Sequence, residues 1–185
     1  MAYTEILCVV ILKDLNKLIC FFSVSIFVCK FTTIKSIKNK SIMQNIKILI
    51  LCTGNSCRSQ MAHGFLQSFA PSWTIASAGT EASGKLNLKA VEVMKEIGVD
   101  ISHHTSDSVE KYLNDEWDYV ITVCGGANES CPAFIGKVKH RLHIGFDDPS
   151  ETVGTDEEIQ ADFIRVRDEI RKAFYELYEN INEDK

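Results

Sequence analysis

The chain has 185 residues, of which 45% are hydrophobic and 24% charged, and its formal net charge is −5. This length is typical of one domain with a full hydrophobic core, and the composition excludes a disordered chain, a collagen-like repeat and a polytopic membrane protein. An acidic chain is not built to coat nucleic acid, so we expect no nucleic-acid partner. Seven cysteines, an odd number, indicate reduced thiols in a cytoplasmic protein rather than a disulfide framework.

The first 42 residues differ from the rest. They carry six lysines against Glu5 and Asp14, a net charge of +4, so residues 43–185 carry −9. Their apolar runs, 6–12 and 18–29, are shorter than the roughly 20 residues of a membrane-spanning helix, and no clear signal-peptide cleavage site follows them. We expect residues 1–42 to be an extension outside the fold, with Met43 as the true start and no membrane partner. A membrane-attached or signal segment is the alternative.

The remaining chain alternates strand and helix patterns. Residues 46–51 are almost continuously apolar, as in a strand buried on both faces of a parallel sheet, and residues 58–69 carry an apolar helix face. Leu88, Val91, Met94 and Ile97 predict the apolar face of a second helix. The expected elements are a strand at 46–51, a helix at 58–69, a strand at 73–76, a helix at 88–97, a short helix at 109–113, a strand at 118–123, a loop at 125–139, a strand at 141–144 and a long helix at 157–178.

This alternation predicts a single-domain α/β fold in residues 43–185. Strands that alternate with helices form a parallel sheet covered on both faces. We therefore expect three layers, with a central four-stranded parallel sheet flanked by helices.

The segment between the first strand and the first helix carries the main chemical signal. Cys52 and Arg58 enclose five residues at the carboxyl edge of the expected sheet, where open α/β folds bind ligands. Backbone N–H groups, the helix N-terminus and the guanidinium of Arg58 there form a cradle for a tetrahedral oxyanion. The same groups favour a thiolate at Cys52 and make it a nucleophile. The expected oxyanion-binding residues are Thr53, Gly54, Asn55, Ser56, Cys57, Arg58 and Ser59. The alternative is a buried cysteine near an unrelated arginine.

Two further cysteines suggest a thiol relay. Cys124 ends the third strand, and Cys131 follows after the flexible Gly125–Gly126 pair. Two thiols that bracket a loop beside a thiolate site are arranged for disulfide exchange. A zinc site is less favoured, because the spacing is not that of a zinc pair and no adjacent histidine completes it. Two ordinary loop cysteines are the remaining alternative.

The motif Cys-Thr-Gly-Asn-Ser-Cys-Arg-Ser-Gln-Met-Ala, which begins at Cys52, closely resembles the phosphate loop of the low-molecular-weight protein tyrosine phosphatase superfamily. More narrowly, the chain resembles the thioredoxin-coupled arsenate reductases, from about Ile46 to Leu177. The matching segments are Ser77-Ala78-Gly79, His104-Thr105-Ser106-Asp107, Gly145-Phe146-Asp147-Asp148-Pro149 and the stretch from Arg165 to Ile170.

The resemblance implies roles for individual residues. The general acid is the residue before proline, Asp148, with Asp147 less favoured, and Cys131-Pro132 matches the second cysteine of the reductase pair. The implied reaction reduces arsenate through Cys52, Cys124 and Cys131 in turn, with thioredoxin as the external reductant and no metal or organic cofactor. Arsenate and thioredoxin are the expected partners of a monomer.

Some relatives hold a potassium ion beside the loop. The matching positions here are Asn55, His63, Ser77, Thr105 and Asp107, and His63 stands where the relatives have a carboxylate. A hard cation loses its best oxygen ligand there, so these are weak potassium candidates and we expect no resident metal.

Two other functions remain open at this point. A low-molecular-weight phosphatase would use the same Cys52, Arg58 and Asp148 to hydrolyse phosphate monoesters, although Ser150 and Glu151 stand where such enzymes usually carry aromatic residues. A side phosphatase activity is expected even of a reductase, because arsenate and phosphate have the same shape. The third possibility is a non-enzymatic module that senses oxyanions or redox state.

Overall fold

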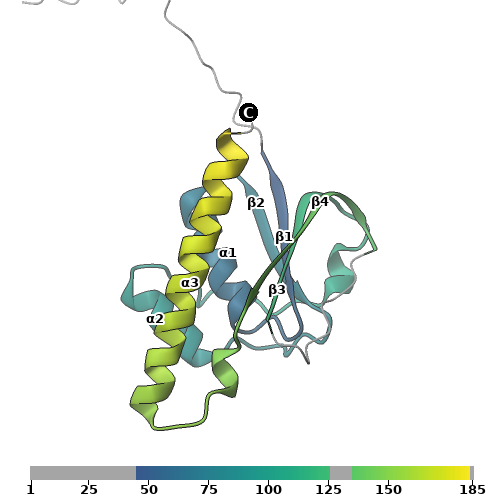
Figure 1. The fold of residues 1–185 in the computed structure, drawn as a ribbon. Coiled ribbons are helices and arrows are strands. Elements are labelled where there is room, and N and C mark those ends of the chain that lie inside the picture. The colour runs from purple at the N-terminus through teal and green to yellow at the C-terminus, as the bar shows by residue number, and fades with distance from the viewer. Residues whose placement is uncertain (1–44, 126–134, 184–185) are drawn as a thin grey trace, which may run out of the picture. The chain divides into compact units, whose positions relative to one another are not determined.

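The computed structural model describes residues 45–125 and 135–183. The expected extension at 1–42 and Cys131 lie outside these residues. Within them, a four-stranded parallel sheet has the order β2-β1-β3-β4 (Figure 1). Its strands are β1 (Lys47–Cys52), β2 (Thr74–Gly79), β3 (Glu116–Cys124) and β4 (Lys137–Phe146). The predicted four-stranded parallel sheet is confirmed.

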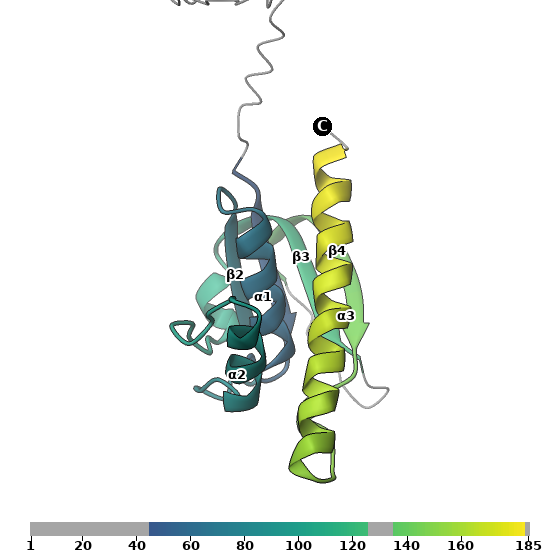
Figure 2. The same cartoon turned by 90° about the vertical axis from the view of Figure 1, so that its left-hand side faces the viewer.

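Helices cover one face of this sheet. They are α1 (Arg58–Phe69), α2 (Leu88–Glu96) and α3 (Asp156–Glu183), and Figure 2 shows α1 and α3 side by side in front of the strands. The opposite face carries a short 3-10 helix, η1 (Val109–Tyr112), and a second 3-10 helix, η2 (Pro149–Glu151), precedes α3. None of the described helices combines the length and apolar character needed to cross a bilayer.

The alternation of side chains along β1 explains this layering. Ile48 and Ile50 are fully buried toward the helices, whereas Leu49 and Leu51 are fully buried against the residues around η1. Because successive strand residues point to opposite faces, a strand apolar at every position must be covered on both sides. The continuous apolar run at the start of the fold therefore places β1 in the centre of the molecule.

The predicted apolar face of the second helix was wrong at its first residue. Leu88 is 84% exposed, and the buried residues of α2 are Ala90, Val93 and Met94. A Cβ atom on Gly64 of α1 would lie 2.6 Å from Ile101 Cγ2 and 3.2 Å from Met94 Cε. Gly64 thus lets Met94 on the buried face of α2 pack closely against α1, a contact that spacing along α2 alone does not predict.

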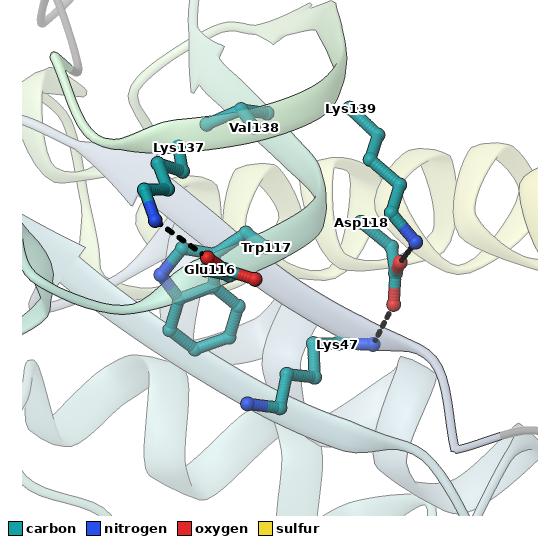
Figure 3. A pocket seen from close by; sticks show the side chains of 7 residues that line it. All are labelled: Lys47, Glu116, Trp117, Asp118, Lys137, Val138 and Lys139. Carbon is teal, nitrogen blue, oxygen red and sulfur yellow. Dashed lines mark hydrogen bonds and ion pairs between the residues drawn. The ribbon is translucent and has the colours of Figure 1, made fainter.

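The strand expected at 141–144 is longer than predicted, and its start lies in the segment 125–139 that was expected to be loop. β4 is an edge strand that is exposed along most of its length, so it lacks an apolar pattern. Figure 3 shows two ion pairs at the start of this strand. Lys137 and Lys139 lie 2.7 Å from Glu116 and Asp118 of β3, respectively. These pairs border a cavity of about 410 Å³ at the amino ends of the strands, away from the carboxyl edge.

Candidate active site

Cys52 is the last residue of β1, and its sulfur is the centre of the candidate site. Its Sγ accepts a hydrogen bond of 3.0 Å from the backbone N–H of Asn55 and shares one of 2.9 Å with Ser59 Oγ. The side chain is buried. The sulfur thus lies at the centre of the loop, where the predicted nucleophile is expected.

The loop after Cys52 owes its shape to Asn55, which is fully buried and has a φ of +47°. Asparagine adopts this left-handed conformation more readily than most residues. Its side chain donates to Ser59 Oγ at 2.9 Å and accepts from the backbone N–H of Asp107 at 2.8 Å. Gln60 Nε2 donates to both the Asn55 carbonyl and its side-chain oxygen, at 3.0 and 3.1 Å. The buried side chain of Gln60 thus holds the loop, a role the sequence analysis missed.

The carbonyl groups of the loop face a neighbouring segment. Those of Cys52, Thr53, Gly54 and Ser56 accept hydrogen bonds from backbone N–H groups within residues 80–87. In a planar trans peptide the N–H group points opposite to the preceding carbonyl. The N–H groups that follow these carbonyls therefore point away from residues 80–87, and the one on Asn55 reaches the sulfur. This arrangement supports the predicted oxyanion cradle.

Gly79 at the end of β2 allows the loop to approach the sheet so closely. A Cβ atom at this position would lie 2.4 Å from the carbonyl oxygen of Thr53 and 3.0 Å from the nitrogen of Asn55. No larger residue fits without displacing the loop backbone. Its place after a strand was visible in the sequence, but the loop that packs against it was not.

Arg58 begins α1 and joins the loop to the segment after β4. Its Nη1 donates to the carbonyl of Phe146 at 3.1 Å, and its Nη2 forms an ion pair of 2.5 Å with Asp148 Oδ2. The Arg58 side chain is 5% exposed and that of Asp148 is 19% exposed. The structure thus brings together an arginine and a carboxylate 90 positions apart, at the mouth of the loop.

The two neighbouring aspartates have different surroundings. Asp148 faces Arg58, whereas Asp147 is 74% exposed and lies 3.3 Å from Arg165 of α3. Arg165 also binds Asp162 and Glu169 on its own helix, at 2.7 and 2.9 Å. This geometry favours Asp148 over Asp147 as an acid near the cradle.

Cys57 is buried in the same hydrophobic cluster as Cys52. Burial raises the pKa of its thiol well above the ordinary value, and the negative charge of Asp148 adds to that effect. A thiol held neutral is a poor nucleophile, so Cys57 is suited to packing.

Cys124 ends β3 at the same edge of the sheet as Cys52. It is buried, belongs to the same hydrophobic cluster, and is paired in register with Phe146 of β4. Leu51 of β1 is paired with Thr122 of β3, which puts the two strand ends at nearly the same level. Cys52 and Cys124 thus end adjacent parallel strands, as the proposed relay requires.

The positions considered for potassium lie together, but their oxygens are occupied by donors. Asn55 Oδ1 accepts from two N–H groups, Asp107 Oδ2 accepts from Lys111 and from Tyr112, and the carbonyl of Thr105 accepts from Gln60. Ser77 Oγ shares a hydrogen bond of 3.2 Å with His63 Nδ1. A hard cation would have to compete with these donors for its oxygen ligands, so these positions remain weak potassium candidates.

Two adjacent imidazoles, those of His63 and His104, lie beside this network and predict a pH effect on stability. His63 and His104 have ring centroids 4.3 Å apart. Burial, with the neighbouring histidines, lowers the pKa of His63 from 6.5 to about 3 and that of His104 from 6.5 to about 4. Below pH 6.5 the unfolded chain binds protons that the folded chain excludes, so the free energy of unfolding falls as the pH drops toward 4.

We expect His63→Gln to flatten this pH dependence. Chemical denaturation at pH 7, 6 and 5 measures it, and His140→Gln, at an exposed histidine of β4, is the control. An equal loss of stability on acidification in the wild type and in His63→Gln contradicts the prediction.

Known proteins are similar to this chain in sequence and in fold. The family described as "Low molecular weight phosphotyrosine protein phosphatase" matches residues 47–185. A curated relative, the arsenate reductase of Halalkalibacterium halodurans, is 53% identical over 126 residues, which cover 68% of this chain and 89% of the relative.

Solved structures of arsenate reductases are also similar to this fold. "An arsenate reductase in the phosphate binding state" superposes with a TM-score of 0.61 at 31% identity, covering 74% of this chain and 98% of the other. A thioredoxin-dependent arsenate reductase of Corynebacterium glutamicum has a TM-score of 0.54 at 26% identity, with 77% and 65% covered. The strand–loop–helix geometry at Cys52 and these similarities lead to one conclusion: this chain belongs to the low-molecular-weight phosphotyrosine protein phosphatase family.

Proposed function

We propose that this protein reduces arsenate to arsenite. The observation that carries the proposal is the environment of the Cys52 sulfur. It accepts a hydrogen bond from the Asn55 N–H and contacts Ser59, in the same loop as Arg58, which is ion-paired with Asp148. The named arsenate reductases among its relatives direct that chemistry toward arsenate rather than toward a phosphate ester.

In the proposed first step the Cys52 thiolate attacks arsenic(V) held in the cradle. One arsenic–oxygen bond breaks, and Asp148 gives a proton to the departing oxygen, which leaves as water. Arg58 and the loop N–H groups bind the remaining oxygens and stabilise their charge. The Arg58–Asp148 ion pair, at 2.5 Å, must exchange part of its contact for the incoming oxyanion.

The second step moves the oxidation onto sulfur. The Cys124 thiolate attacks Cys52 Sγ, a Cys52–Cys124 disulfide forms, and the sulfur–arsenic bonding pair stays on arsenic, which leaves as arsenite. Cys131 then attacks Cys124 Sγ and releases the Cys52 thiolate. The resulting Cys124–Cys131 disulfide is reduced by a dithiol protein.

We propose thioredoxin as that reductant, supported by the thioredoxin-dependent reductase of the same fold. We also propose that the protein is a cytoplasmic monomer that needs no metal or organic cofactor, and that residues 43–185 carry its activity. The alignment of the family with residues 47–185 supports this last point.

The test is arsenate-dependent oxidation of NADPH by the purified protein in the presence of thioredoxin and thioredoxin reductase. We expect turnover only with all components, and we expect Cys131→Ser to release about one arsenite per protein and then stop, because Cys52 stays in a disulfide. Quantifying arsenite in the first seconds separates a single turnover from none.

Two results count against the proposal. Normal turnover of Cys131→Ser rules out the relay. Rapid hydrolysis of aryl phosphates together with no arsenate reduction identifies the protein as a phosphatase that uses the same Cys52, Arg58 and Asp148.

A further inference from the structure

We propose that Ser150 is a positioning residue for the general acid: its hydroxyl holds the carboxyl group of Asp148 so that one oxygen faces the cradle. The inference rests on the proposed function and assigns a role to a residue that the catalytic scheme leaves out.

Asp148 presents its two oxygens to different partners. Oδ2 faces Arg58 Nη2 at 2.5 Å, on the side of the phosphate loop. Oδ1 accepts a hydrogen bond of 2.6 Å from Ser150 Oγ and one of 3.0 Å from the Ser150 backbone N–H. One residue thus contributes two donors to a single oxygen, which fixes the rotation of the carboxyl group about its own bond.

The backbone around this pair is also constrained. Asp148 is the N-cap of η2 and Pro149 is its first residue, so Ser150 Oγ lies within reach of the capping carboxylate. Pro149 is buried, whereas Ser150 is exposed. The serine side chain therefore contributes little to core packing, and its described hydrogen bond is the one to Asp148.

A hydroxyl group differs from the other two partners in one property. An N–H group and a guanidinium only donate, so both favour the ionised carboxylate, but a hydroxyl both donates and accepts. When the proton for the departing oxygen is on Oδ2, Oδ1 remains a carbonyl acceptor, so Ser150 Oγ keeps its hydrogen bond to it. Ser150 thus holds the carboxyl group in one orientation through both protonation states.

The charged and titratable groups around Asp148 come from each neighbouring element. They are Arg58 and Cys57 from the loop and α1, Asp147 and Glu151 from its own segment, and Arg165 from α3, which binds Asp147. A serine-to-alanine change leaves all of them in place.

Removing the Ser150 hydroxyl takes one hydrogen bond from the Asp148 carboxylate and lets the carboxyl group rotate more freely. For Ser150→Ala we expect kcat to fall about three- to tenfold, with little change in the arsenate KM. A general acid loses activity as the pH rises through its pKa, and the variant lacks one donor to the carboxylate, so we expect that descending limb to move to higher pH. Ser150→Thr keeps a hydroxyl and is expected to behave like the wild type.

A merely structural role predicts different results. Loss of a hydrogen bond at a helix cap lowers stability but does not shift the descending part of the pH profile of kcat. Ser108→Ala is therefore the matched control. Ser108 caps the 3-10 helix η1 through a hydrogen bond of 3.3 Å with the Glu110 N–H. We expect it to lower thermal stability about as much as Ser150→Ala does, with an unchanged pH profile.

The decisive experiment measures pH profiles of kcat for the wild type, Ser150→Ala, Asp148→Asn and the double variant. If Ser150 acts through Asp148, its removal has little further effect once the acid is gone, and the two losses are not additive. Additive losses, or an unmoved limb in Ser150→Ala, overturn the proposal.

The same variants are assayed for hydrolysis of phenyl phosphate, whose poor leaving group also needs an acid. If the wild type does not reduce arsenate, the proposed function fails, while the role of Ser150 is still decided by the phosphatase profiles. A wild type that is inactive in both reactions overturns both.

Discussion

Replacing Cys52 with serine is expected to lower arsenate reduction, and any hydrolysis of aryl phosphates, by roughly a thousandfold or more. A serine hydroxyl is far less ionised than a thiol near neutral pH and cannot enter a disulfide, so both the attack and the relay are lost. Oxyanion binding should survive, because Arg58 and the loop N–H groups remain. Initial rates measure the first effect, and calorimetric titration with arsenate measures the second.

Cys57→Ser is the matched control for this prediction. Cys57 lies in the same loop and is equally buried, but its thiol belongs to neither the attack nor the relay, and the backbone N–H that it offers to the expected cradle is kept by serine. We expect turnover to persist at a reduced stability, because a hydroxyl replaces a buried thiol in the hydrophobic cluster. If Cys57→Ser is as inactive as Cys52→Ser, the assignment of the nucleophile is wrong.

Gly79→Ala is expected to have the second largest effect. The added Cβ would lie 2.4 Å from the backbone oxygen of Thr53, and backbone cannot yield as a flexible side chain does. We expect a loss of about 1–3 kcal/mol in the free energy of unfolding and a fall of roughly a hundredfold in kcat/KM, because the displaced loop no longer aims its N–H groups at the oxyanion.

Gly64→Ala separates the local effect from general destabilisation. Gly64 also has no room for a Cβ, since Ile101 Cγ2 would lie 2.6 Å away, but it is packed against α2 rather than the loop. The Gly64→Ala variant should unfold at a lower temperature than the wild type. At temperatures where it remains folded, its kcat/KM should be unchanged. If Gly79→Ala retains normal kcat/KM and arsenate affinity, Gly79 does not shape the cradle.

The chemistry of the loop could be predicted because it is local. Cys52 ends one strand, Arg58 begins the next helix, and the five residues between them form a single turn of chain. The helix over Arg58–Phe69 was predicted with its observed bounds, since its apolar face and its place after a strand are both local patterns. The placement of Ser59 beside Cys52 follows from the same short segment.

Contacts between distant segments needed the tertiary structure. Asp147 and Asp148 are identical in type and adjacent in sequence, and only the packing of their loop between α1 and α3 directs one to Arg58 and the other to Arg165. The same reason applies to Gly79, whose constraint comes from a loop more than twenty residues earlier in the chain.

The parallel α/β fold, the family and the loop that follows Cys52 could all be predicted from the sequence, because periodicity, turn chemistry and a contiguous motif are encoded over a few residues. Only the packed structure shows that Asp148, the aspartate favoured by the resemblance, contacts Arg58, that Ser150 hydrogen-bonds to its carboxylate, and which face of α2 is buried. The Arg58–Asp148 contact and the buried face of α2 depend on how separate elements pack against each other. The sequence pattern of one element does not contain the direction from which its neighbour approaches.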